Sequence, residues 1–128
     1  MPVSEEYVEF LLEQLEPFGD GRVRSRRMFG GAGLFLNDLM FALIADDRLY
    51  FKADDENRPR FLAEDLGPFI FVSKAGKRGA LGYYEAPESA LDDAGELLDW
   101  ARLGYDAAVR AAASKPKKKP NKKNPKKK

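Results

Sequence analysis

Residues 22–52 constrain the fold most, because four strand-like runs follow one another there with very little chain between them. The runs are residues 22–27, 33–36, 39–44 and 48–52. The two-residue segments Asn37-Asp38 and Asp46-Asp47 separate the last three runs and have the composition of hairpin turns. Because turns this short join only antiparallel neighbours, the sequence predicts an antiparallel sheet. The third run is apolar on both sides, so we expect it in the interior of the sheet.

Helices are expected on both sides of this region. Ser4 is a candidate N-cap for a first helix, whose apolar face is Val8, Leu11, Leu12 and Leu15. A short helix over about 55–65 and strands over 69–72 and 80–85 follow. A final helical region, divided by Gly95 and ending near Ala113, is indicated by an apolar stripe of Leu91, Ala94, Leu98, Ala101, Tyr105 and Ala108. The expected fold class is α+β: a single antiparallel β-sheet of about five to six strands, with an N-terminal helix, a short middle helix and C-terminal helices packed on it.

Two parts of opposite charge make up the chain. Residues 114–128 hold nine of the 22 basic residues and none of the 21 acidic ones, so residues 1–113 carry a net charge of −8. We therefore expect a folded domain over 1–113 and a disordered lysine-rich tail over 114–128. A mobile polycation binds the phosphates of DNA or RNA without reading sequence. The candidate nucleic-acid-binding residues of the tail are Lys115, Lys117, Lys118, Lys119, Lys122, Lys123, Lys126, Lys127 and Lys128. The alternatives are a solubilising tail, an anchor for acidic proteins or anionic lipid, and an electrostatic partner of the acidic domain itself.

The stretch RVRSRRMFGGAG, residues 22–33, places arginines just before a glycine cluster. The lysine and hydroxyl of a phosphate-binding loop are missing after Gly33, so we interpret the glycines as hairpin chemistry, with positive φ or a bulge. Arg22, Arg24 and Arg26 should share one strand face and form a basic surface, which Lys74, Lys77 and Arg78 of a later loop would extend. The alternative is a solvated face paired with nearby acids.

Few residues here suit catalysis. The chain has no cysteine and no histidine, which excludes disulfides, thiolate zinc sites and every nucleophile–histidine pair. Paired carboxylates occur at 46–47, 54–55, 64–65 and 92–93, but adjacent residues usually point to different sides, so capping and solvation are the expected roles. Aromatic residues at Tyr83, Tyr84, Trp100 and Tyr105 suit either base stacking or core packing. We predict no enzymatic activity, no cofactor and no metal.

Three runs together resemble the TfoX N-terminal domain over about residues 3–112: VSEEYVEFLLEQL, RRMFGGAGLFLNDLMFALIADDRLYFKAD and YYEAPESALDDAGELLDWARL. This domain stands at the front of the TfoX/Sxy competence regulators and occurs alone in many small bacterial proteins. The resemblance implies an α+β fold and a regulatory, non-enzymatic role in transcription and competence. Full-length regulators continue into a second, helical domain, where this sequence has its lysine-rich stretch.

The function expected from these observations is binding. The tail would hold the protein near DNA or RNA, and the domain would engage a protein partner such as a transcription regulator. The alternative is a stand-alone protein-interaction module or homodimer without a nucleic-acid role. The N-terminus has no signal-peptide pattern and no apolar run is long enough to span a bilayer, so we expect a cytoplasmic protein without membrane contact.

Overall fold

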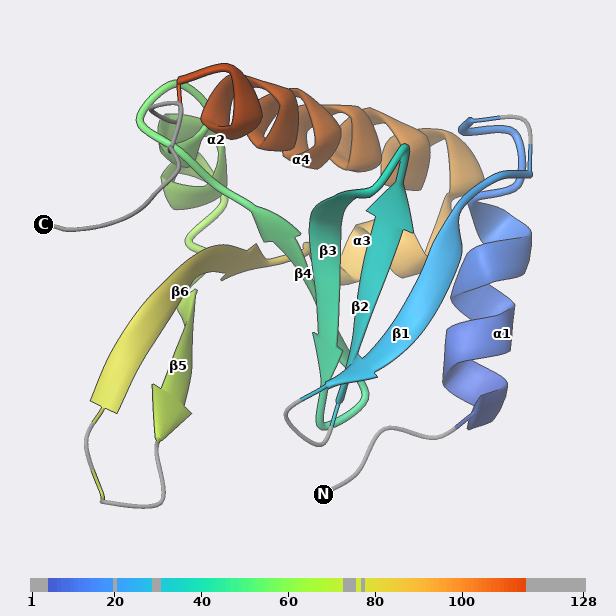
Figure 1. The fold of residues 1–128 in the computed structure, drawn as a ribbon, viewed down its shortest axis with the longest axis horizontal. Coiled ribbons are helices and arrows are strands. Elements are labelled where there is room, and N and C mark those ends of the chain that lie inside the picture. The colour runs from blue at the N-terminus through green and yellow to red at the C-terminus, as the bar shows by residue number, and fades with distance from the viewer. Residues whose placement is uncertain (1–4, 20, 29–30, 73–75, 77, 115–128) are drawn as a thin grey trace, which may run out of the picture.

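An open antiparallel sheet is the framework of the molecule (Figure 1). The structure is a computed structural model and describes residues 5–19, 21–28, 31–72, 76 and 78–114. Within these residues the sheet has six strands in the order β1-β2-β3-β4-β6-β5: β1 (Arg24–Met28), β2 (Gly31–Leu36), β3 (Leu39–Ala45), β4 (Arg48–Lys52), β5 (Pro68–Val72) and β6 (Arg78–Glu85). The helices are α1 (Glu5–Gln14), α2 (Arg58–Ala63), α3 (Glu88–Asp92) and α4 (Ala94–Ser114). The predicted α+β class, with an interior third strand, is confirmed.

Both predicted two-residue turns are present. Asn37 and Asp38 have φ angles of 53° and 65°, and Asp46 and Asp47 have φ angles of 53° and 57°. Two successive left-handed residues form the turn type whose twist matches that of the flanking strands, and asparagine and aspartate tolerate this conformation best. Local turn chemistry therefore sets the register of β2, β3 and β4.

Gly31 and Gly33 have a different structural role from the one that the sequence predicts. Gly31 and Gly33 lie inside β2, and neither has a positive φ, so the hairpin interpretation is wrong for these two residues; Gly30 lies outside the described residues. A Cβ atom at Gly31 would lie 2.1 Å from the carbonyl oxygen of Ile44 on β3. Glycine is needed there because the neighbouring strand's backbone comes too close for any side chain.

A β-bulge in β3 gives the sheet two different apolar faces. The partner on β3 moves from Ala42, opposite Leu34, to Met40, opposite Phe35, which leaves Phe41 as an extra residue. Phe41 and Ala42 both join the buried core, while Met40 pairs on the opposite side. The continuous apolar run over 39–44 thus supplies side chains to both faces.

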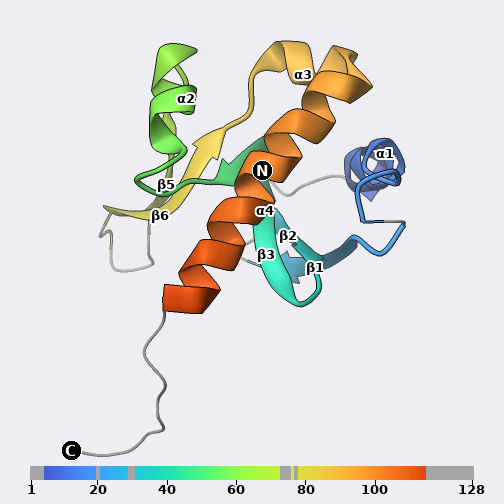
Figure 2. The ribbon, with the colours of Figure 1, turned by 90° about the horizontal axis from the view of Figure 1, so that it is seen from above.

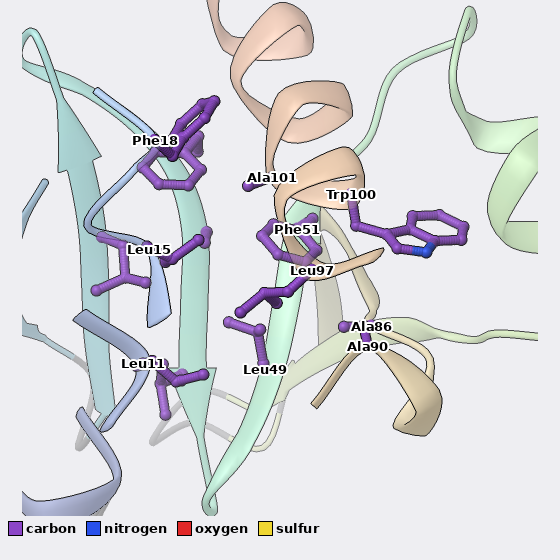
Figure 3. Close-up of a cluster of buried hydrophobic side chains, with 14 of the residues drawn as sticks. Leu11, Leu15, Phe18, Leu49, Phe51, Ala86, Ala90, Leu97, Trp100 and Ala101 are labelled. Atoms are coloured by element: carbon purple, nitrogen blue, oxygen red, sulfur yellow. The ribbon is translucent and has the colours of Figure 1, made fainter. Parts of the chain in front are cut away.

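The main core lies between one face of the sheet and helices α1, α3 and α4. Leu11 of α1, Leu15 directly after this helix, Phe51 of β4 and Leu97 of α4 are almost fully buried and belong to one cluster. Figure 3 shows these side chains pointing toward one another from the helices and the strands. Burial of each such side chain stabilises the fold by roughly 1.5–3 kcal/mol.

The face of α4 that contacts the sheet coincides only in part with the predicted stripe, of which Ala101 and Ala108 are buried. Ala94 is exposed and Leu98 is only half-buried, whereas the buried residues are Leu97, Trp100, Ala101, Gly104, Ala107 and Ala108. The difference arises because the closest contact is made by Gly104, where an added Cβ would lie 2.7 Å from the carbonyl oxygen of Phe41. Small residues carry little apolar signal, so the stripe of larger residues predicted the wrong face in part.

The break between the last two helices falls at Asp93 rather than at Gly95. Asp93 is extended, with φ −137° and ψ 106°. Its Oδ1 accepts hydrogen bonds from the backbone N–H groups of Gly95 (2.9 Å) and Glu96 (3.2 Å) and so caps α4.

A buried asparagine joins the end of β4 to α4. Asn57 is 2% exposed, and its Nδ2 donates to the carbonyl oxygens of Lys52 and Leu103, both at 3.0 Å. Its Oδ1 accepts from the backbone N–H of Asp54 at 2.8 Å. Nearby, Arg110 of α4 donates to both carboxylate oxygens of Asp54, at 2.6 and 3.0 Å. These contacts hold the last turns of α4 against the loop after β4.

Gly104→Ala should lower the free energy of unfolding by about 1–3 kcal/mol, because the added methyl group has no room against β3. The helix propensity of alanine would act in the opposite direction by about 1 kcal/mol. Urea unfolding measures the change. Gly67→Ala is the control, since no atom lies within 4 Å of its added Cβ. A Gly104→Ala protein as stable as the wild type would contradict the close contact.

The stability contributed by Asp54 should depend on pH. The hydrogen bond from Arg110 is the main cause that holds the pKa of the Asp54 carboxyl below its ordinary value, against the opposing effect of burial. A group with a lowered pKa in the folded state stabilises the fold above its unfolded pKa of about 3.9, and this contribution is lost as pH falls through the folded-state value.

The difference in the free energy of unfolding between the wild type and Asp54→Asn, here called the stability gap, should therefore become smaller as pH is lowered from about 6 to about 3. Thermal unfolding across this range measures the gap. Asp55→Asn makes the same charge change at a side chain that is 97% exposed, and it should give a smaller gap at every pH. A gap for Asp54→Asn that stays constant with pH would show that the ion pair contributes nothing.

Candidate functional site

The predicted arginines of β1 lie at an edge of the sheet. Arg24 and Arg26 are exposed and pair with Phe35 and Gly33 of β2, so both belong to the sheet face away from the helices. Arg22 precedes the strand, and its Nε donates to the carbonyl oxygen of Gly19 at 3.2 Å. Arg27 is also exposed, but it belongs to the opposite face of the sheet, because successive strand residues point to opposite sides. Two of the three predicted arginines thus share a strand face.

Two rows of side chains cross the sheet on the face opposite the helices, which we call the open face. The strand register places Arg26, Gly33, Leu43, Tyr50 and Glu85 in one row across β1, β2, β3, β4 and β6. The second row contains Arg24, Phe35 and Met40, followed by the pair Lys52 and Tyr83. Figure 1 views the sheet with α3 behind its strands. In the second row, apolar residues thus lie between Arg24 and Lys52, whereas the first row runs from Arg26 to the acidic Glu85.

Phe35 lies on the open face next to the β2–β3 turn, on the second strand from the edge of the sheet, and three neighbouring residues surround it. A Cβ added to Gly33 would lie 3.1 Å from Cε1 of Phe35 and 3.0 Å from the sulfur of Met40, so both side chains lean over the glycine. The guanidinium carbon of Arg26 is 5.7 Å from the centre of the Phe35 ring. Phe35 remains half-buried, so part of its ring is in contact with solvent.

Lys52 and Tyr83 form a second cation–aromatic pair. The Nζ of Lys52 is 5.2 Å from the centre of the Tyr83 ring. Tyr83 is 6% exposed, and its hydroxyl donates to the carbonyl oxygen of Met40 at 3.3 Å. Burial raises the pKa of Tyr83 to about 12, so the hydroxyl stays protonated and keeps this hydrogen bond at neutral pH.

A shallow hollow of about 290 Å³ adjoins these residues at the end of the sheet where β2 turns into β3. Phe35, Met40, Lys52 and Tyr83 line it together with Ala111 and other residues of the last turns of α4. The side-chain amide of Asn37 in the β2–β3 turn donates to the hydroxyl of Tyr105 at 3.0 Å, which ties this corner to α4. The helix that leads into residues 115–128 therefore ends beside the open face.

The amino-acid sequence is similar to that of a family of known proteins. The family model of the TfoX N-terminal domain matches residues 13–108. The chain belongs to the TfoX N-terminal domain family. The DNA transformation protein TfoX1 of Aliivibrio fischeri is 51% identical over 47 residues, which cover 37% of this chain and 22% of that protein. Protein Sxy of Escherichia coli is 24% identical over 95 residues, which cover 74% of this chain and 45% of that protein. The matches span less than half the length of either relative.

The family match contains the whole open face of this TfoX N-terminal domain. Its range of residues 13–108 runs from the end of α1 through most of α4. The last turn of α4 and the lysine-rich residues lie beyond it. The open face thus belongs to the shared domain, and the lysines belong to the part of the chain outside the family match.

Several predicted site residues cannot be placed on the fold. The nine tail lysines, together with Lys74 and Lys77, lie outside the described residues. Arg78, predicted in a loop, begins β6 and pairs with Val72. Their proposed contribution to a basic surface remains a prediction.

The paired carboxylates that the structure describes have local structural roles. Asp46 and Asp47 form a turn, Asp93 caps α4, and Asp54 binds Arg110. Among the described residues, no group of three or more acidic side chains is placed to hold a metal ion. No helix in the described ranges has the length and apolarity required to cross a bilayer.

The aromatic residues singled out in the sequence pack in the interior. Trp100 lies 5.0 Å from Phe61 between ring centres, Tyr84 packs on the same phenylalanine at 5.5 Å, and Tyr105 packs edge-on against Phe18. The core-packing interpretation is confirmed for Tyr84, Trp100 and Tyr105.

Sequence reasoning missed Phe35, Met40 and Lys52. Phe35 stands between Leu34 and Leu36 in the same strand. Because strand residues alternate between faces, this position could have placed Phe35 on the face opposite the two buried leucines.

Proposed function

We propose that this chain is a non-enzymatic regulatory module that acts by binding, in the same broad process as its relatives. Membership of the TfoX N-terminal domain family carries the proposal, because one matched relative is named a DNA transformation protein. The absence of histidine and cysteine from the sequence supports a binding role over catalysis. The proposed setting is transcription regulation or competence in the bacterial cytoplasm, with a transcription regulator as protein partner.

The proposed contact with nucleic acid is made by the lysine-rich residues. Nine lysines in residues 114–128 would exchange places with the counterions condensed on DNA or RNA. Three prolines in the same stretch oppose helix formation and favour an extended chain that can follow a phosphate backbone. Lysine is a point charge without the planar fork that reads base edges, so this binding would be independent of sequence.

The acidic domain would limit the strength of this binding. A net charge of −8 over residues 1–113 repels a polyanion at distances within the Debye length, about 8–10 Å at physiological salt. The lysines would hold nucleic acid close to the domain at low salt and release it as salt rises. Such weak, salt-dependent tethering suits a protein whose folded part recognises a separate partner.

Binding to labelled 20-base-pair DNA should weaken steeply with salt. With roughly 5 to 8 phosphate contacts, the slope of log affinity against log salt should be about −5 to −7. Fluorescence anisotropy of the full chain over a salt series measures it. The control replaces the nine tail lysines with glutamine, which keeps the chain length and removes the charge. A slope near zero, or equal binding by the glutamine variant, would contradict the role of the tail.

The exposed edge of the sheet favours a second candidate function, self-association. β5 is the last strand of the sheet, and its sequence PFIFV contains no charge. Pro68 is exposed and Ile70 is 41% exposed. The opposite edge strand, β1, carries three arginines, which discourage edge-to-edge pairing. Antiparallel pairing of two β5 strands about Ile70 would bring together uncharged surfaces in a symmetric dimer.

Ile70→Lys should shift a dimer to monomer, because two lysines would then face each other across the symmetry axis. Sedimentation velocity over a concentration series measures the shift. Leu62→Lys is the matched control, since Leu62 is also an exposed apolar residue, at 57%, but lies on α2. A wild-type chain that stays monomeric at all concentrations would exclude this candidate.

A further inference from the structure

We propose that the open face of the sheet is itself a binding surface for single-stranded nucleic acid, with a base stacked on Phe35 and phosphates held by Arg24, Arg26 and Lys52. This inference rests on the proposed nucleic-acid role and assigns part of it to the folded domain. It requires three things of the structure: an aromatic ring accessible to a base, cations at the right places around it, and few opposing charges.

The Phe35 ring meets the first requirement. It is half-buried on a face that the helices do not cover, and Gly33, Met40 and Arg26 restrict its movement. A ring that is already held in place loses little side-chain entropy when a base stacks on it. Gly33 contributes by having no side chain, so that the side chains of Phe35 and Met40 can lie directly over its backbone. Sheets with exposed aromatic residues bind unpaired bases in this way, without a demand for one sequence.

The cations lie on both sides of the ring. Arg24 pairs directly with Phe35 across β1 and β2, and Arg26 is two residues further along the same strand. Lys52 lies on β4, three strands away from β1, which corresponds to about 14 Å at the usual strand spacing. A strand of nucleic acid crossing the sheet would meet arginines at one side, Phe35 and Met40 in the middle, and Lys52 at the other side.

Acidic groups are few on the open face. Glu85 accepts a hydrogen bond from Arg48 at 2.7 Å, so its charge is balanced locally. Asp38 lines the hollow beside Phe35 and is an opposing charge next to the proposed path. The surplus of acid lies elsewhere: α1, on the other side of the sheet, exposes Glu5, Glu6, Glu9 and Glu13, and the exposed Glu16 follows this helix. The −8 charge of the domain is therefore distributed unevenly, and the open face is its basic side.

The arrangement favours single strands over a duplex. The bases of a duplex are stacked on one another, so none is available to Phe35 unless the duplex opens. Phosphate contacts alone would need no apolar surface, yet the half-buried Phe35 and Met40 lie between Arg24 and Lys52 on the open face. An apolar centre flanked by cations matches a chain with a charged backbone and unpaired bases.

The end of α4 connects this surface to the lysine-rich residues. Ala111 and Ala112 line the same hollow as Phe35 and Lys52, and Ser114 is the last residue of the helix. Ser114 itself lines another hollow, with Asp54, Asp55 and Glu56. A strand lying on the open face would lie within reach of the lysines, and the two contacts would reinforce each other through a high effective concentration.

The experiment compares variants of the full chain on three probes: a labelled 20-nucleotide single-stranded DNA of mixed sequence, the corresponding RNA, and a 20-base-pair duplex. Phe35→Leu should lower the affinity for the single strands by at least about fivefold and leave duplex binding unchanged. Arg26→Gln should reduce the salt slope for single strands by about 0.7, the value for one phosphate contact. Arg27→Gln is the matched control, because it removes the same charge from the next residue on the other face.

The outcomes separate the two proposals. Unchanged single-strand affinity in both Phe35→Leu and Arg26→Gln, together with loss of binding when the tail lysines become glutamine, would overturn the open-face inference and leave the tail tether intact. Absence of binding by the wild-type chain to all three probes would overturn both. Equal effects of Arg26→Gln and Arg27→Gln would show general electrostatics and would also overturn the inference. Thermal unfolding checks that each variant is folded; if Phe35→Leu is not, the Arg26 and Arg27 pair decides.

Discussion

The close contact of α4 with β3 and β4 is the constraint on which the rest of the structure depends. Gly104 brings the helix so near that a single added carbon would lie 2.7 Å from the backbone of β3. Ala101, Ala107 and Ala108 continue this contact along the helix, which crosses the sheet diagonally in Figure 2. Because one face of the sheet is covered so tightly, the same strands must present their alternate residues on the other face. The open face is a direct consequence of this packing.

Hydrogen bonds at the end of β4 fix the position of the last turns of α4. Asn57 binds the carbonyl groups of Lys52 in β4 and Leu103 in α4 and the N–H of Asp54. Arg110 binds the Asp54 carboxylate with two hydrogen bonds. A buried hydrogen-bond network of this kind specifies one arrangement, because any shift would leave polar groups unsatisfied. The arrangement places Ala111 and Ala112 of the helix beside Phe35 and Lys52.

Much of the framework could be predicted because its signals are local. Two-residue turns with left-handed residues, the period-two strands and the C-terminal end of α1 all depend on residues within a few positions of one another. The predicted N-cap, Ser4, lies outside the described residues. The failures have a common cause. The glycines of β2 and Gly104 of α4 are required by backbone segments far away in the sequence, and a glycine gives no local indication of what comes close to it. The predicted stripe of α4 was displaced for the same reason.

The amino-acid sequence by itself determined the fold class, the turns, the division of charge and the family resemblance, since each depends on residue types and short spacings. Only the tertiary structure decided which residues meet on the open face. Arg26, Gly33, Leu43, Tyr50 and Glu85 form one row because five strands pair in a particular register, with a bulge at Phe41 that no periodicity reveals. The two-residue turns set the register of β2, β3 and β4 locally, whereas the bulge and the pairing of β4 with β6 result from the packing of the sheet as a whole. A shift of one residue there would exchange the two faces.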